Sequence, residues 1–347
     1  MDVHGGDIYA HGGVRLDFSV STNPRGLPEF VRAALLAGID ACARYPDPQC
    51  RALRAALARH EGAPPERILC GNGATDLIHR LCHTIRPRTA LVCAPSFSEY
   101  ERALRQCGCR VGRHVLRREE GFALTAAIEE KLLPGLEMLF ICQPNNPTGG
   151  LAEAALLERI VRRAAGNGTR VMVDECFLEF TSAGSVAAWL DDAPGLVVLK
   201  ALTKTYALAG LRLGYLLSSD AGLLAALAAA APYWNVSTPA QIAGVAALSC
   251  PRSCETWLAE SRRLLAEERA FLGEALRALG IEVFPGEASF LLLRCDVPLF
   301  EPLLRQGILI RACANFAGLD ASFYRIGIRT RPENAALLRA IEEALDG

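Results

Sequence analysis

The sequence predicts an α/β protein with a large, mostly parallel sheet and a smaller α+β domain in its C-terminal part. Three observations support this fold. The chain has 347 residues, a length typical of about two domains. From residue 67 to residue 217, short apolar runs alternate with amphipathic segments, as in a sheet covered by helices on both faces. After residue 250 this alternation ends, and one long amphipathic segment precedes several short apolar runs.

The elements of the large sheet follow a Gly- and Pro-rich segment of about thirty residues. That segment shows little periodicity, so we expect it to form an arm. Helices are expected from near Ala74, at residues 98–108 and at residues 152–166, where apolar residues recur with helical spacing. The strands are expected at residues 67–70, 89–94, 109–116, 137–143, 169–175, 195–200 and 211–217.

The C-terminal part begins with a long helix expected at residues 254–279. Strands with two helices among them follow, at residues 281–284, 289–295, 308–313 and 324–329. We therefore divide the chain into an arm at 1–30 that contributes to the small domain and the site, a large domain at 31–245 and a small domain at 246–347.

The composition of the chain limits the partners, the compartment and the metal sites that we expect. The chain has 37 Lys plus Arg and 38 Asp plus Glu, so we expect no nucleic-acid or membrane partner. The N-terminal stretch lacks a basic region followed by an apolar run, and the longest apolar run, LLAALAAAA, is too short to span a bilayer; a cytoplasmic protein is expected. The thirteen cysteines are scattered without the spacing of a zinc site, so we expect buried, reduced thiols and no metal.

Lysine is rare in this chain. Lys131, Lys200 and Lys204 are the only lysines, and arginine supplies the other positive charges. A lysine can lose its proton and attack a carbonyl as a free amine, which arginine cannot do. Lys204 follows a predicted strand and is the best candidate. Lys200, inside that strand, is its competitor, whereas Lys131 on a predicted helix is expected to be solvated.

Polar clusters follow four of the predicted strands, where the carboxyl ends of parallel strands meet. The clusters are GNGATD, QPNNPTGG, DEC and ALTK. The first can hold a phosphate at a helix N-terminus or form an ordinary capped turn. Asp174 in the third can cap a helix or pair with a buried cation. Each cluster has a purely structural alternative, but together they predict one functional cleft.

Five motifs occur in family order: GNGATD, APSFSEY, PNNPTG, VDECF and LTKTYALAGLRLGY. They resemble the pyridoxal-phosphate enzymes of fold type I, the aspartate aminotransferase fold, and the histidinol-phosphate aminotransferase branch in particular. The segments HGGDIY, DFSVSTNPRGLP, RYPDPQ and ILIRACANFAGLDASFYRIGIR look more narrowly like the threonine-phosphate decarboxylases, which make aminopropanol phosphate for cobalamin assembly. The resemblance covers nearly the whole chain.

The resemblance implies that pyridoxal 5'-phosphate is the cofactor and that the large domain binds it. Lys204 would attach to the cofactor aldehyde and later move protons. Asp174 would pair with the pyridine nitrogen, Asn146 would bond to the ring hydroxyl oxygen, and Phe97 would stack on the ring. Tyr45 would reach the cofactor phosphate of the partner subunit, which implies a homodimer with shared sites. The residues expected to hold the phosphate within one chain are Gly73, Ala74, Thr75, Thr203 and Arg212.

The substrate implied by the resemblance is a small phosphorylated amino acid with two anionic groups, which need two cationic partners. Arg311 and Arg325 are the candidates, and His4 and Asn23 of the arm would close over the substrate. A second His-Gly-Gly at His11 is an alternative to His4. One departure from the family concerns the cofactor phosphate: Ala201 stands where a hydroxyl residue is usual.

The expected activity is pyridoxal-phosphate-dependent decarboxylation of L-threonine O-3-phosphate to (R)-1-amino-2-propanol O-2-phosphate for cobalamin biosynthesis. A histidinol-phosphate aminotransferase is the enzymatic alternative. A non-catalytic protein that binds the cofactor or a phosphate ligand is the alternative of another class, and it would not need Lys204. His79 and His83 have the i, i+4 spacing of metal ligands, but without a third ligand we expect them to pack.

Overall fold

The computed structural model describes residues 4–346, and its largest element is a seven-stranded sheet. The strand order is β2-β8-β7-β6-β5-β3-β4, and β8 alone runs antiparallel to both of its neighbours. The mostly parallel sheet expected from the sequence is therefore confirmed. Its strands are β2 (Ile68–Gly71), β3 (Thr89–Ala94), β4 (Arg110–Val115), β5 (Met138–Cys142), β6 (Arg170–Asp174), β7 (Leu196–Ala201) and β8 (Gly214–Ser218).

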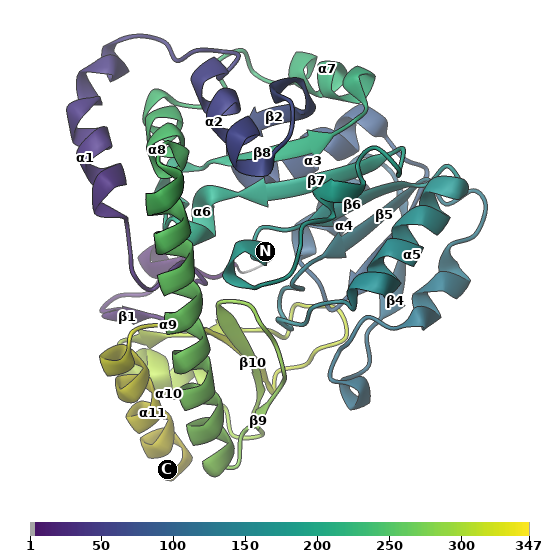
Figure 1. Cartoon of the computed structure of the whole chain (residues 1–347). Helices are drawn as coiled ribbons and strands as arrows, with labels where there is room; N and C mark the ends of the chain where they lie inside the picture. Colours follow the sequence, from purple (N-terminus) through teal and green to yellow (C-terminus); the bar gives the residue numbers. More distant parts are fainter. Residues whose placement is uncertain (1–3, 347) are drawn as a thin grey trace.

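Helices cover both faces of this sheet (Figure 1). The strands are apolar almost throughout, and alternate residues enter two separate cores: in β5, Leu139 and Ile141 face one core, and Met138 and Phe140 face the other. The helices are α1 (Glu29–Ala37), α2 (Arg51–Glu61), α3 (Gly73–Ile85), α4 (Ser98–Gln106), α5 (Ala154–Gly166), α6 (Leu202–Thr205), α7 (Ala221–Ala229) and α8 (Thr238–Leu248).

The C-terminal part contains a four-stranded sheet of order β12-β13-β10-β9. The long helix α9 (Pro251–Ala278) runs from the side of α8 down to β9, as Figure 1 shows. The other elements are β9 (Glu282–Val283), β10 (Phe290–Arg294), α10 (Phe300–Arg305), β11 (Ile308–Leu309), β12 (Arg311–Ala312), β13 (Phe323–Gly327) and α11 (Arg331–Asp346).

The N-terminal arm is tied to this C-terminal part by backbone hydrogen bonds. Strand β1 (Leu16–Asp17) pairs in parallel with β11, and the amide of Gly327 donates to the carbonyl of Phe18 at 2.7 Å. The arm therefore lies between the seven-stranded sheet and the four-stranded sheet (Figure 1). The division of the chain at residues 30 and 245 stays a prediction.

Most of the expected strands begin or end one or two residues away from their bounds in the structure, and three of them are cut short or divided. The strand expected from residue 211 begins at Gly214, because Arg212 adopts a left-handed conformation with φ 58° that a strand cannot contain. The strand expected at residues 308–313 is divided into β11 and β12, which join different sheets. The strand expected at residues 281–284 is reduced to β9. Among the described residues, no helix is long and apolar enough to cross a membrane.

Candidate active site

One cavity of about 220 Å³ collects the polar residues that follow the strands of the large sheet. It opens where β5, β6 and β7 end, facing the arm and the strands β12 and β13. The ends of parallel strands are where ligands bind in open α/β sheets. The lining includes these residues predicted from the sequence: His4, Ala74, Thr75, Phe97, Asn146, Asp174, Thr203, Lys204, Arg212, Arg311 and Arg325.

Lys204 lies on the short helix α6, directly after β7, and its side chain enters the cavity. Burial and the nearby guanidinium of Arg325 lower its pKa to about 8. A far larger share of this amine than of an ordinary lysine is therefore neutral near physiological pH, and the neutral form is the one that a nucleophile requires. The backbone around Lys204 is held by Asn23, whose backbone N–H donates to the Lys204 carbonyl at 2.9 Å.

Asp174 ends β6 and is buried. The hydroxyl of Tyr100 donates to its Oδ2 at 2.6 Å, and the amide of Cys176 donates to its Oδ1 at 3.0 Å. Burial raises the pKa of Asp174, and these two hydrogen bonds oppose that rise. A buried carboxylate that faces a cavity is suited to a cationic partner there.

A cradle forms where β2 turns into α3, beside Arg212. Gly73 has φ +83°, and a Cβ at this position would lie 2.6 Å from Nη2 of Arg212, so glycine allows the guanidinium to approach the backbone. The first turn of α3 then presents Ala74 and Thr75 to the cavity. Free amides at a helix N-terminus, together with a guanidinium, bind phosphate well. Ala201, which also lines the cavity, offers this cradle no hydroxyl.

Two buried arginines form the wall that faces Lys204. Arg325 on β13 donates from Nη1 to Asn146 Oδ1 and from Nη2 to the carbonyl of Ser19 at 2.8 Å, while its Nε has no partner among the described residues. Burial lowers the pKa of Arg325 to about 10. Arg311 on β12 donates to the carbonyl of Ala312 and to Asn315 Oδ1, both at 2.8 Å. Two guanidiniums held in this way suit a ligand with two anionic groups.

The two histidines of the arm are separated by the structure. His4 lines the cavity, and its Nε2 lies 2.9 Å from Oε1 of Glu99. His11 instead packs its ring against Phe300, at a centroid distance of 6.0 Å. His4 is therefore the arm histidine at the site.

Asn23 lies beside the cavity wall rather than in its lining. Asn23 is buried. Its side-chain nitrogen Nδ2 donates to the carbonyl of Thr205 and to Ser261 Oγ, both at 2.8 Å. The physical reason for these contacts is that the polar backbone after Lys204 is buried and needs a donor. Asn23 therefore joins the arm to α6 and α9, and its expected closure over the substrate stays a prediction.

Tyr45 lies outside the cavity of its own chain. Its side chain is 77% exposed and stacks on Trp234 at a centroid distance of 4.2 Å. Its expected contact with a cofactor phosphate concerns a partner subunit and stays a prediction.

The competitor Lys200 points to the opposite face of β7 from Ala201. Its Nζ donates to Glu61 Oε2 at 2.7 Å and lies 3.7 Å from Glu175 Oε2. Burial raises the pKa of Glu175 to about 7. The other lysine, Lys131, is exposed and donates to a backbone carbonyl.

The two histidines with metal-like spacing have other partners. His79 Nε2 lies 2.9 Å from Glu99 Oε2, and His83 Nδ1 lies 2.8 Å from the carbonyl of His79. No group of three potential metal ligands occurs among residues 4–346.

Sequence reasoning missed two residues of α4 that hold site groups in place. Tyr100 bonds to Asp174, and Glu99 lies between His4 and His79. Hydrogen bonds from the two histidines, that of His4 above all, lower the pKa of Glu99 to about 2, although burial opposes this. Both residues belong to the motif APSFSEY, two and three positions after Phe97, so their place in the motif was a usable signal.

The cavity fits pyridoxal phosphate by the chemistry of its residues. A lysine with a lowered pKa, a buried carboxylate and a phosphate cradle that requires glycine surround one space, and the ring of Phe97 lies at its edge. These are the groups needed for the aldehyde, the pyridine nitrogen and the phosphate of this cofactor.

Comparisons with known proteins agree with this geometry. Residues 15–341 match the family model "Aminotransferase class I and II". The chain is 43% identical over 338 residues to the threonine-phosphate decarboxylase of Salmonella typhimurium, covering 96% of this chain and 92% of that protein. It is 35% identical over 342 residues to a histidinol-phosphate aminotransferase of Desulfitobacterium hafniense, with the same coverage of 96% and 92%.

Among solved structures, the histidinol-phosphate aminotransferase of Clostridium acetobutylicum superposes with a TM-score of 0.88 at 28% identity. The match covers 95% of this chain and 99% of the other. Similarity in sequence and in fold thus extends over nearly the entire chain, and the chain belongs to the class I and II aminotransferase family.

Proposed function

We propose that this protein is a pyridoxal-phosphate enzyme that decarboxylates L-threonine O-3-phosphate to (R)-1-amino-2-propanol O-2-phosphate, a step of cobalamin biosynthesis. The observation that carries the proposal is the pair of buried arginines, Arg311 and Arg325, in the cavity that contains Lys204. Threonine phosphate has a carboxylate and a phosphate, and each is matched by a guanidinium. The 43% identity to a threonine-phosphate decarboxylase supports the same assignment.

Four residues would hold the cofactor ring. Lys204 would bind the aldehyde carbon through Nζ, Asp174 would keep a proton on the pyridine nitrogen, Asn146 would bond to the ring hydroxyl, and Phe97 would cover one face. When bound, the cofactor supplies an electron sink for the electron pair left at the substrate Cα. The cradle of Gly73 and its neighbours would hold the phosphate.

The way in which the protein binds the carboxylate and the phosphate of the substrate selects which bond at the substrate Cα breaks. With the cofactor bound, placing the carboxylate as the group that leaves would release CO2, and a proton would replace it at Cα. Placing the Cα–H bond there would lead to loss of the proton and to transamination instead. Lys204 Nζ, neutral or protonated near its pKa of about 8, is the group available to move this proton.

The decisive experiment measures CO2 release from purified protein supplied with pyridoxal phosphate and L-threonine O-3-phosphate, without a keto acid. Transamination cannot turn over under these conditions, so sustained CO2 with matching aminopropanol phosphate supports the proposal. Turnover of histidinol phosphate only after 2-oxoglutarate is added would establish the aminotransferase instead. No turnover in either assay would favour a binding protein.

A homodimer in the cytoplasm belongs to the same proposal. Tyr45 is exposed beside Tyr233 and Trp234, and Leu36 and Ile39 are also exposed, which suits a protein interface. Sedimentation analysis should give twice the mass of the chain. Mixing two defective variants, Lys204→Ala and Tyr45→Ala, should restore activity if each site combines the Lys204 of one subunit with the Tyr45 of the other.

A further inference from the structure

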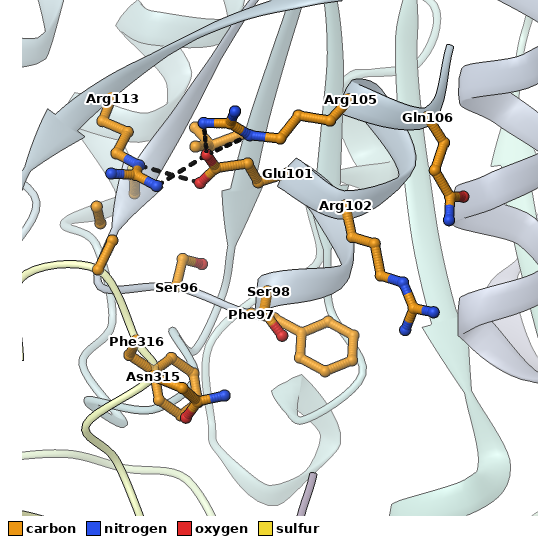
Figure 2. Close-up of a pocket in the computed structure, with 14 residues that line it drawn as sticks. Ser96, Phe97, Ser98, Glu101, Arg102, Arg105, Gln106, Arg113, Asn315 and Phe316 are labelled. Atoms are coloured by element: carbon orange, nitrogen blue, oxygen red, sulfur yellow. Dashed lines mark hydrogen bonds and ion pairs between the residues drawn. The ribbon is translucent and has the colours of Figure 1, made fainter. Parts of the chain in front are cut away.

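A second cavity, of about 480 Å³, adjoins the active-site cavity and is rich in arginine. Its lining comes from α4, from Arg113 on β4 and from residues 315–317, and Figure 2 shows Arg113, Asn315 and Phe316 across from α4. Phe97 and Phe316 line both cavities, so their rings form a shared wall. None of the roles assigned above uses this space.

The surface of this second cavity is locally positive. The carboxylate of Glu101 accepts hydrogen bonds from Arg105 Nη2 at 2.5 Å and from Arg113 Nη2 at 2.8 Å (Figure 2). The Glu101 side chain is only 17% exposed, whereas those of Arg105 and Arg113 are 63% and 45% exposed. One covered carboxylate between two exposed guanidiniums leaves an excess of positive charge that faces the cavity.

A third arginine extends into the same space. Arg102 on α4 also lines this cavity, and Figure 2 shows its side chain beside Phe97, on the side away from the Arg105–Glu101–Arg113 cluster. Its Nη1 lies 3.2 Å from Oε1 of Glu99, and its side chain is 51% exposed. The hydroxyls of Ser96 and Ser98 and the amide of Asn315 add polar groups to the lining.

Two contacts connect this cavity to the substrate groups of the active site. Glu99, which pairs with Arg102, also lies 2.9 Å from His4. Asn315, which lines the second cavity, accepts a hydrogen bond from Arg311 at 2.8 Å. The two spaces are therefore separated by one layer of side chains. Arg311 contacts a residue that lines the second cavity, and His4 is linked to Arg102 of that cavity through Glu99.

We propose that this second cavity is the entry vestibule of the active site, where Arg102, Arg105 and Arg113 dock a phosphate monoester dianion before it reaches Lys204. Guanidinium groups suit phosphate because their planar N–H groups match its oxygens. The chain as a whole has a net charge of −1, so a dianion gains its attraction from a local field. The identity of the docked ester as substrate rests on the proposed function.

The first test compares variants of the holoenzyme in kinetics with threonine phosphate. The double variant Arg102→Gln with Arg113→Gln should lower kcat/KM roughly tenfold at low ionic strength, because steering depends on the local field. Its kcat should be unchanged. The difference should vanish at about 0.5 M NaCl, where screening is strong. The matched control, Arg159→Gln with Arg162→Gln, removes two charges of similar exposure, 54% and 49%, on α5 and should keep the wild-type kcat/KM.

Arg102→Lys with Arg113→Lys separates charge from packing. Because lysine preserves the charge, this variant should retain most of kcat/KM. If the lysine variant lost as much kcat/KM as the glutamine variant, the proposed vestibule would be overturned, since packing rather than charge would then account for the loss.

The second test does not depend on which reaction the enzyme performs. Inorganic phosphate is titrated into each holoenzyme variant by calorimetry, and phosphate should bind roughly tenfold more weakly only when Arg102 and Arg113 are replaced by glutamine. If this holds while threonine phosphate releases no CO2, the proposed function fails and the vestibule stands. If phosphate binding and kcat/KM are equal in all variants, the vestibule is overturned even when CO2 release is found.

Discussion

The hydroxyl of Tyr100 donates a 2.6 Å hydrogen bond to Oδ2 of Asp174, and both side chains are buried. The bond joins α4 to the end of β6. It also helps to keep Asp174 ionised, because burial alone raises the pKa of this carboxyl. Tyr100 therefore acts as a positioning residue behind the carboxylate that is proposed to face the cofactor.

Replacing Tyr100 by Phe should weaken cofactor binding. The change removes one donor from a buried carboxylate, which costs about 1–3 kcal/mol, so the Kd of pyridoxal phosphate should rise roughly tenfold or more. Fluorescence titration of the apoenzyme measures this. Tyr206→Phe is the control, because its hydroxyl contacts Cys254 Sγ outside the cavity. An equal rise in both variants would assign the effect to general loosening of the core.

Covalent capture of the cofactor should depend on pH with a midpoint near 8. The lowered pKa means that Lys204 is neutral above about pH 8, whereas an ordinary lysine is neutral only above 10.5. The capture rate of the apoenzyme, followed by absorbance, should therefore rise from pH 6 through a midpoint near pH 8 and level off roughly one to two pH units above it. After borohydride reduction, mass spectrometry should find the cofactor on wild-type protein and on Lys131→Ala, but not on Lys204→Ala. Label on Lys200 would contradict the assignment.

Glu99→Gln and His4→Gln should impair substrate binding to the same extent. The 2.9 Å contact between these residues holds His4 at the cavity, and glutamine cannot make a charge-assisted bond. We expect KM for threonine phosphate to rise roughly tenfold in each single variant, with kcat changed little.

The double variant Glu99→Gln with His4→Gln should be no worse than either single one, because both act through one interaction. His79→Gln removes the other histidine from Glu99 and should have a smaller effect on KM. Additive losses in the double variant would show that Glu99 does not act through His4.

Glu175→Gln should change how stability depends on pH. Burial raises the Glu175 pKa from 4.5 to about 7, so the folded state favours the protonated acid. The stability this contributes is complete below pH 4.5 and is lost as pH rises through 7. Glutamine cannot ionise, so the variant should gain up to about 3 kcal/mol relative to wild type between pH 5 and 8. Urea unfolding at both pH values measures this, with Glu158→Gln on the surface as control.

Much of the fold follows from local sequence. Strands buried on both faces must be continuously apolar, so β3, β5, β6 and β7 were recognisable without knowledge of their neighbours. The polar clusters at the ends of these strands were recognisable for the same reason, because a change from apolar to polar residues marks the strand end. The start of β8 was not recognisable in this way, since Arg212 has a left-handed backbone and its guanidinium lies against Gly73, which is far away in the sequence.

The sequence by itself determined the strands of the large sheet in chain order, the helices α3, α4, α5 and α9, the polar residues at the ends of the strands, and the preference for Lys204 over Lys200. Only the tertiary structure decided which face of β7 carries Lys200, that Asn23 supports the backbone beside Lys204, and that Glu99 and Tyr100 hold His4 and Asp174. The reason is physical. Apolar periodicity depends on neighbours within a few residues, whereas a buried polar group must find its partner across the fold, and Glu99 and His4 are 95 positions apart.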